Sequence, residues 1–174
     1  MGKGMPAALL MATARAALRA VSDEALAERA VSRAAAALAD DLDRSGSFVT
    51  IFRAHVTLGT RCLSYVDAGH GHVFLRRAGG AVEALAPRAL PLGAFPDAPS
   101  EGGTLVLGAG DLLVVYSDGL PDSLGDHAPS SEQLSALAVS APTAAAVVER
   151  LIALAPTQTT LPDDLTVIAL RCTG

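Results

Sequence analysis

Three carboxylates border the two most apolar strand-like runs of this sequence. Asp118 directly follows the run 112–117, and Asp163 and Asp164 directly precede the run 165–170. If the two runs pair as antiparallel strands, the end that carries Asp118 meets the start that carries Asp163. Two or three carboxylates would then share one small region, and buried or crowded charges need a partner.

A bound hard divalent cation would neutralise the charge of such a cluster of carboxylates. No lysine lies near these carboxylates, and the arginines of the C-terminal stretch are distant in sequence. Mg²⁺ and Mn²⁺ prefer oxygen ligands, which carboxylates supply. The alternative is that each aspartate caps a turn, and the spacing alone leaves both interpretations open.

Two histidines suggest a different metal. Asp67-Ala68-Gly69-His70 is followed by His72, and strand alternation would put both histidines on one face, as a zinc pair requires. No third ligand stands at a useful spacing, so a glycine-mediated turn is the favoured interpretation. The sequence has no Gly-x-Ser-x-Gly elbow, Walker loop or dinucleotide fingerprint, which argues against serine hydrolases, nucleotide hydrolases and Rossmann enzymes.

The composition of the chain argues against several classes of protein. The chain has 174 residues, the length of one domain, and its 51% hydrophobic and 18% charged residues exclude intrinsic disorder. A net charge of −5, with Lys3 as the only lysine and no tryptophan, argues against nucleic-acid binding. No apolar run reaches the roughly 18 residues of a membrane span. Two cysteines without a disulfide or metal spacing indicate a reducing compartment, so we expect a cytoplasmic protein.

The periodicity of the chain predicts an α+β fold. A first helix is expected over 5–20, with Pro6 in its first turn, and a second from a Ser22 cap to about Arg44. A long Pro/Gly-rich surface loop is expected over 87–103. Two shorter helices are expected over 131–140 and 143–155. Strands are expected over 48–57, 61–67, 72–77, 81–84, 104–108, 111–117 and 165–171. Helical hairpins around such a meander predict a sheet layer or sandwich covered by helices.

Six segments of the sequence together resemble the stage II sporulation protein E-type serine/threonine phosphatases, a bacterial branch of the metal-dependent (PPM, type 2C) protein phosphatases. Each segment is a weak signal, but six in this order along the whole chain are specific. They are residues 2–12 (GKGMPAALLMA), 48–50 (FVT), 67–70 (DAGH), 90–93 (LPLG), 110–113 with 116–119 (GDLL, YSDG) and 163–166 (DDLT).

The resemblance implies an antiparallel β-sandwich flanked by helical hairpins, with a two-metal Mn²⁺ or Mg²⁺ centre at one end. Asp118 and Asp163 correspond to metal ligands, with Asp164 less favoured. The resemblance also places Gly2, Lys3, Gly4, Gly69, His70 and Gly119 near the active site. In this family the metals activate a water that attacks the phosphorus, so no catalytic side chain is assigned. His70 stands where other branches carry an aspartate for a further metal, which argues against a third metal here.

The family's known substrates are mostly phosphorylated anti-anti-sigma (STAS-domain) regulators, so the resemblance implies a phosphoprotein partner of this kind. Relatives carry a metal-binding aspartate just upstream of Gly-Lys-Gly, and opening strands before it. Met1 immediately precedes Gly2 here, so we expect residues 1–174 to form one phosphatase domain that lacks its N-terminal part.

Three hypotheses follow for the function. The first is a phosphatase whose activity the missing half of the metal site would weaken or abolish. The second is a catalytically silent partner-binding module. The third is a truncated version of a longer gene product. Without the opening strands, a sheet edge and an apolar face would be uncovered. We therefore expect dimerisation or poor solubility.

Overall fold

The computed structural model describes residues 4–95, 98–139, 141–156 and 161–174. These residues form two compact units, each with one antiparallel sheet and its own helices. Unit 1 comprises residues 1–71 and 86–106, and unit 2 comprises residues 72–85 and 107–174. The predicted α+β fold with two antiparallel sheets and flanking helices is confirmed.

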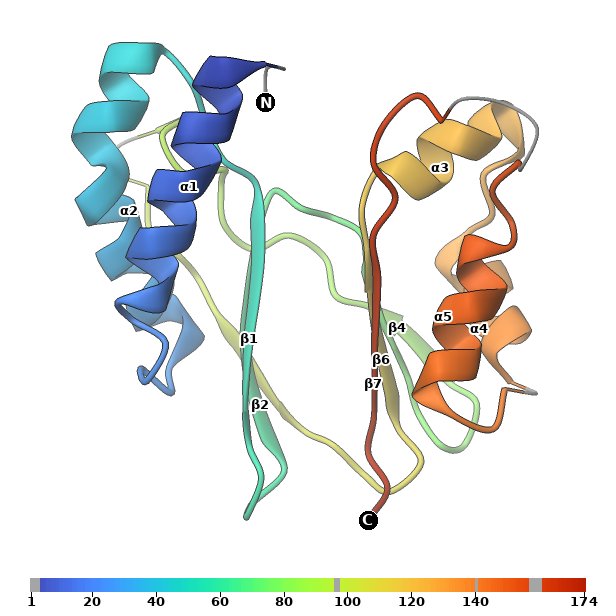
Figure 1. Ribbon diagram of the computed structural model, residues 1–174. Helices are drawn as coiled ribbons and strands as arrows, with labels where there is room; N and C mark the ends of the chain where they lie inside the picture. The colour runs from blue at the N-terminus through green and yellow to red at the C-terminus, as the bar shows by residue number, and fades with distance from the viewer. Residues whose placement is uncertain (1–3, 96–97, 140, 157–160) are drawn as a thin grey trace. The chain divides into compact units, whose positions relative to one another are not determined.

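Unit 1 is a helical hairpin on a three-stranded sheet (Figure 1). Its strand order is β1-β2-β5, so the central strand β2 is covered by neighbours on both edges and is almost entirely buried. One stripe of α2 packs on this sheet, because its apolar residues recur every three or four positions. The elements are α1 (Met5–Arg19), α2 (Ala27–Ser45), β1 (Ile51–Thr57), β2 (Cys62–Ala68) and β5 (Gly103–Val106).

Unit 2 is a four-stranded sheet of order β4-β3-β6-β7 with α4 and α5 beside it (Figure 1). Alternate residues of β6, Leu112, Val114 and Tyr116, join the core that contains Leu134 of α4 and Leu151 of α5. The elements are β3 (Val73–Arg76), β4 (Val82–Ala84), β6 (Leu112–Tyr116), α3 (Gly119–Leu124), the short 3₁₀ helix η1 (Gly125–His127), α4 (Ser131–Ala138), α5 (Ala144–Ile152) and β7 (Val167–Arg171).

The start of the second helix was predicted wrongly. Ser22 does not cap α2, which begins at Ala27 after a turn, with Leu26 at its N-cap position and no side-chain cap. The N–H of Ala27 instead donates to the Ser64 hydroxyl of β2 at 2.9 Å, in a buried position. The helix therefore begins where a residue far away in sequence satisfies its first backbone donor.

The helix α3 and the short 3₁₀ helix η1 that follows it were not predicted. Residues 119–124 form α3, whose short sequence contains a glycine and a proline and has no clear helical period. Leu120 of α3 is buried in the core of unit 2, so packing rather than intrinsic propensity stabilises this turn of helix. The predicted strands and the other helices agree with the structure to within a few residues at their ends.

No helix in the described part of the chain is long and apolar enough to cross a membrane.

Candidate metal centre

The strands β6 and β7 pair antiparallel, which is the condition under which the sequence placed Asp118 and Asp163 in one region. Their register runs from Leu112 opposite Arg171 to Tyr116 opposite Val167. The residues that follow β6 and the residues that precede β7 therefore lie at the same end of the sheet of unit 2. These are the segments that carry Asp118 on one side and Asp163 with Asp164 on the other.

The two segments are in direct contact. A Cβ added at Gly119 would overlap with the carbonyl oxygen of Asp164 and would lie 2.8 Å from its carbonyl carbon and 3.3 Å from the carbonyl oxygen of Asp163. Only a residue without a side chain permits this approach. Gly119, which the family resemblance placed near the site, is thus the residue that lets the two segments meet.

A hydroxyl group adds a second connection between these segments. Ser117 Oγ donates to the backbone carbonyl of Asp164 at 3.0 Å and accepts the N–H of Thr166 at 2.9 Å. No role for Ser117 was predicted from the sequence. Its signals there were its position, as the polar last residue of an apolar run before Asp118, and its place in the family-like segment 116–119.

All three carboxylates of the candidate centre are exposed. Asp118 occupies the N-cap position of α3, but its side chain makes no capping hydrogen bond, so the turn-capping alternative does not describe it. Asp163 Oδ1 accepts the N–H of Asp164 at 2.8 Å. Among the described residues, no ion pair involves any of the three carboxylates.

The described residues contain no group of three or more histidine, cysteine, aspartate or glutamate side chains close enough to hold a metal ion. The structure thus brings the backbones of the predicted aspartates together without forming a closed ligand set from them. The same observation gives the zinc interpretation of His70 and His72 no support.

The residues 67–70 form a structural turn at the end of β2 in unit 1. The Asp67 carboxylate is completely buried and accepts the N–H of His70 at 2.7 Å and that of Gly71 at 2.9 Å. A Cβ at Gly69 would lie 2.6 Å from Pro91 Cγ, which explains the glycine. This part of the family pattern therefore joins β2 to the loop around Pro91.

His72 and Gly4, two further residues considered in the sequence, make local contacts in the structure. His72, in unit 2, lies with its ring centroid 5.2 Å from that of Tyr116. Burial raises the pKa of Tyr116, and a hydrogen bond with Ser131 partly offsets that increase.

Gly4 is the N-cap residue of α1, and its carbonyl accepts the N–H of Ala8 at 3.1 Å. Gly2 and Lys3 lie outside the described residues.

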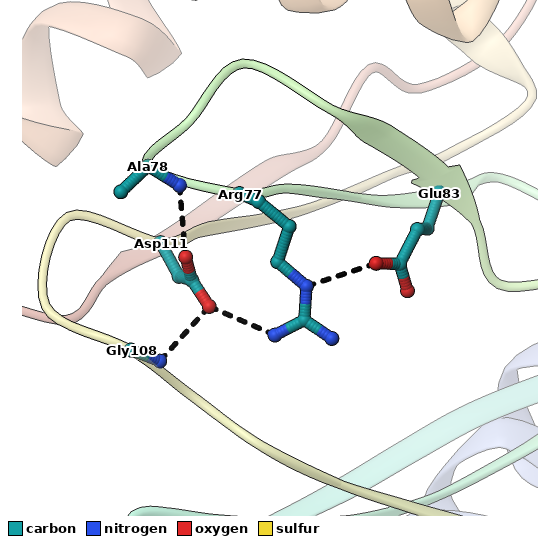
Figure 2. Close-up of polar contacts among 5 residues, drawn as sticks. All are labelled: Arg77, Ala78, Glu83, Gly108 and Asp111. Atoms are coloured by element: carbon teal, nitrogen blue, oxygen red, sulfur yellow. Dashed lines mark hydrogen bonds and ion pairs between the residues drawn. The ribbon is translucent and has the colours of Figure 1, made fainter.

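Asp111 is a buried acid that serves the fold at the other end of β6 (Figure 2). Its carboxylate accepts the backbone N–H groups of Ala78 and Gly108 and pairs with Arg77, each at 2.9 Å, while Arg77 also pairs with Glu83. Burial alone would raise the pKa of Asp111, but these donors outweigh it and hold the pKa below its usual range. Asp111 is therefore an acid with a structural role.

The fold is shared with solved phosphatase structures. A Mycobacterium tuberculosis structure of RsbU and RsbW domains matches with a TM-score of 0.79 and 23% identity, over 98% of this chain and 50% of that one. RsbX in complex with magnesium matches with a TM-score of 0.75 and 17% identity, over 97% and 75% of the two chains.

The phosphatase domain and a regulatory fragment of SpoIIE from Bacillus subtilis match with a TM-score of 0.72 and 20% identity. That match covers 98% of this chain and 52% of the SpoIIE chain, so this chain spans about half of the solved chain. At these identities the likeness establishes a PP2C-type fold. None of the curated proteins compared with the sequence matches it.

The family follows from the sequence itself. The family model described as stage II sporulation protein E (SpoIIE) matches residues 1–173, which is nearly the whole chain. The chain therefore belongs to the SpoIIE family of PPM-type serine/threonine phosphatase domains.

Proposed function

We propose that this chain is a single domain that removes phosphate from phosphoserine or phosphothreonine in a protein, with Mn²⁺ or Mg²⁺ as cofactor. The observation that carries the proposal is the contact between Gly119 and the backbone of Asp164, which brings the segments of Asp118 and Asp163 together at one end of a sheet. Family membership supports the reaction class.

The donor chemistry of these segments fits a hard divalent cation. Asp118 and Asp163 offer exposed carboxylate oxygens from the two sides of the contact, and the family resemblance makes Asp164 the less favoured ligand. A magnesium complex among the similar solved structures supports the same choice of metal. When bound, the ion would lower the pKa of a coordinated water and so supply the attacking nucleophile at neutral pH.

The role of the protein in this proposal is to hold and expose the carboxylates. Asp118 and Asp163 bind the ion, and their exposure leaves room for a phosphorylated side chain of another protein. Gly119 keeps the two segments in contact. A STAS-domain regulator is the proposed substrate class, as the family resemblance implies.

The test is Mn²⁺-stimulated phosphate release from an aryl phosphate and from a phosphorylated STAS domain. Asp118→Asn and Asp163→Asn should each abolish the Mn²⁺-dependent rate. Asp126→Asn, which changes another exposed carboxylate of unit 2, is the matched control and should keep it. Absence of any Mn²⁺-dependent phosphate release from the wild-type chain would contradict the proposal.

A catalytically silent partner-binding module is the second candidate, favoured by the lack of a closed ligand cluster among the described side chains. It predicts that Asp118→Ala leaves binding to a partner protein unchanged and that titration calorimetry detects no tight divalent ion. The phosphatase proposal predicts heat of Mn²⁺ binding that Asp118→Ala removes.

Self-association and a cytoplasmic location complete the proposal. Met5, Leu9 and Met11 of α1 expose 72%, 62% and 53% of their surface, and exposed apolar side chains favour association. Sedimentation velocity should therefore show a dimer that Leu9→Gln weakens, and a concentration-independent monomer would contradict this.

Cys62 and Cys172 are free thiols, which supports the proposed location in a reducing compartment, the cytoplasm.

A further inference from the structure

Ser117 lies where the ladder between β6 and β7 ends and the chain turns into α3. Its N–H donates to the carbonyl of Thr166 at 2.9 Å, as in a regular antiparallel pair. The N–H of Thr166 is bonded to the Ser117 hydroxyl, also at 2.9 Å. The Ser117 carbonyl accepts the N–H of Leu120 at 3.2 Å. The Ser117 carbonyl is thus used in the turn into α3. The Ser117 hydroxyl takes its place as the acceptor of the Thr166 N–H at the end of the ladder between β6 and β7.

The same hydroxyl has a second bond. Its single O–H donates to the carbonyl of Asp164 at 3.0 Å, so both its donor and one of its acceptor positions are used on the segment that precedes β7. The Asp164 carbonyl also touches Gly119. The segment of Asp163 and Asp164 is therefore attached to the segment of Asp118 both by a hydrogen bond and by close packing.

We infer that Ser117 is a positioning residue: its hydroxyl holds the segment of Asp163 and Asp164 in place beside Asp118. The consequence for metal affinity rests on the proposed function, whereas the hold on the segment does not. Ser117 is half-buried and acts through the backbone, so it has no need to touch the ion or the substrate. Loss of a group that orients metal ligands lowers metal affinity by about 10-fold to 100-fold.

The first experiment measures Mn²⁺ binding by the full chain, from the electron paramagnetic resonance signal of free Mn²⁺, so that no activity is needed. Ser117→Ala should weaken Mn²⁺ binding by about tenfold. Ser117→Thr keeps the hydroxyl and should restore affinity close to that of the wild type. Ser123→Ala is the control, because the Ser123 hydroxyl donates within α3, to the Leu120 carbonyl at 2.7 Å. Equal affinities of wild type and Ser117→Ala would overturn the inference.

The second experiment measures amide hydrogen exchange by NMR without metal. In Ser117→Ala the Thr166 amide loses its acceptor and should exchange about tenfold faster, while Ala169, in the middle of β7, should keep its rate. If Ser117→Ala does not fold, Ser117→Cys carries the same expectation, because a thiol of similar shape is a weak hydrogen-bonding group.

The two experiments separate the inference from the proposed function. A wild-type chain that binds no Mn²⁺ refutes the metal centre, and the exchange rate of Thr166 still decides on Ser117. A Thr166 amide that exchanges at the wild-type rate in Ser117→Ala refutes the role of Ser117, whatever the metal does.

Discussion

Gly119 and the carbonyl group of Asp164 are in such close contact that a Cβ on Gly119 would overlap with the carbonyl oxygen. The contact lies between the segment that follows β6, which contains Asp118, and the segment that precedes β7, which contains Asp163. Because the opposing atoms belong to the backbone, no side-chain rotation relieves a substitution there.

Gly119→Ala should therefore push the two segments apart. We expect a loss of about 1–3 kcal/mol in the free energy of unfolding, the usual range for overpacking, together with weaker Mn²⁺ binding. Urea denaturation and a Mn²⁺ titration measure the two effects.

Gly79→Ala is the matched control in the same unit, because a Cβ at Gly79 meets nothing within 4 Å. Its free energy of unfolding and its Mn²⁺ affinity should stay at wild-type values. If Gly119→Ala were as stable and bound Mn²⁺ as tightly as Gly79→Ala, the contact would have no role in holding the segments.

The Asp111 carboxylate should make folding stability depend on pH. Its folded pKa lies below the unfolded value of about 3.9, so its contribution to stability is complete above that value and is lost as pH falls through the folded pKa. Asp111→Asn removes this dependence and should destabilise the fold at neutral pH by about 1–3 kcal/mol, since Arg77 loses a charged partner. Urea denaturation at a series of pH values between neutral and acidic measures both.

A surface ion pair gives the comparison for Asp111. Arg44 and Asp40 are 3.6 Å apart with side chains that are 75% and 88% exposed, and such pairs contribute little. Asp40→Asn should leave both the stability and its pH profile nearly unchanged. An equal effect of Asp40→Asn and Asp111→Asn would show that burial of the Asp111 network is unimportant.

Ser64→Ala should weaken the attachment of α2 to the sheet of unit 1. The buried Ala27 N–H would lose the Ser64 hydroxyl as its acceptor, which costs about 1–3 kcal/mol of unfolding free energy. The Ser45 hydroxyl, which bonds to the Asp41 carbonyl on the surface of α2, provides the control Ser45→Ala. Denaturation midpoints that shift equally for the two variants would contradict this role of Ser64.

The sequence by itself determined the elements whose signals are local. The apolar runs around 112–117 and 165–170 predicted β6 and β7, and their antiparallel pairing, which the structure supplies, brings Asp118 and Asp163 to one end of a sheet. The alanine-rich stretch after Pro6 predicted α1 almost to the residue. These features depend on propensity and periodicity, which are readable within one segment.

Only the tertiary structure decided the features that depend on contacts between distant residues. Ala27 begins α2 because Ser64 accepts its N–H, and α3 forms because Leu120 finds a core to enter. Asp111 is structural because Arg77 and two backbone amides surround it, whereas Asp118 and Asp163 stay exposed. An aspartate has the same chemistry in each place, and the partners that folding brings to it separate a structural acid from a candidate metal ligand.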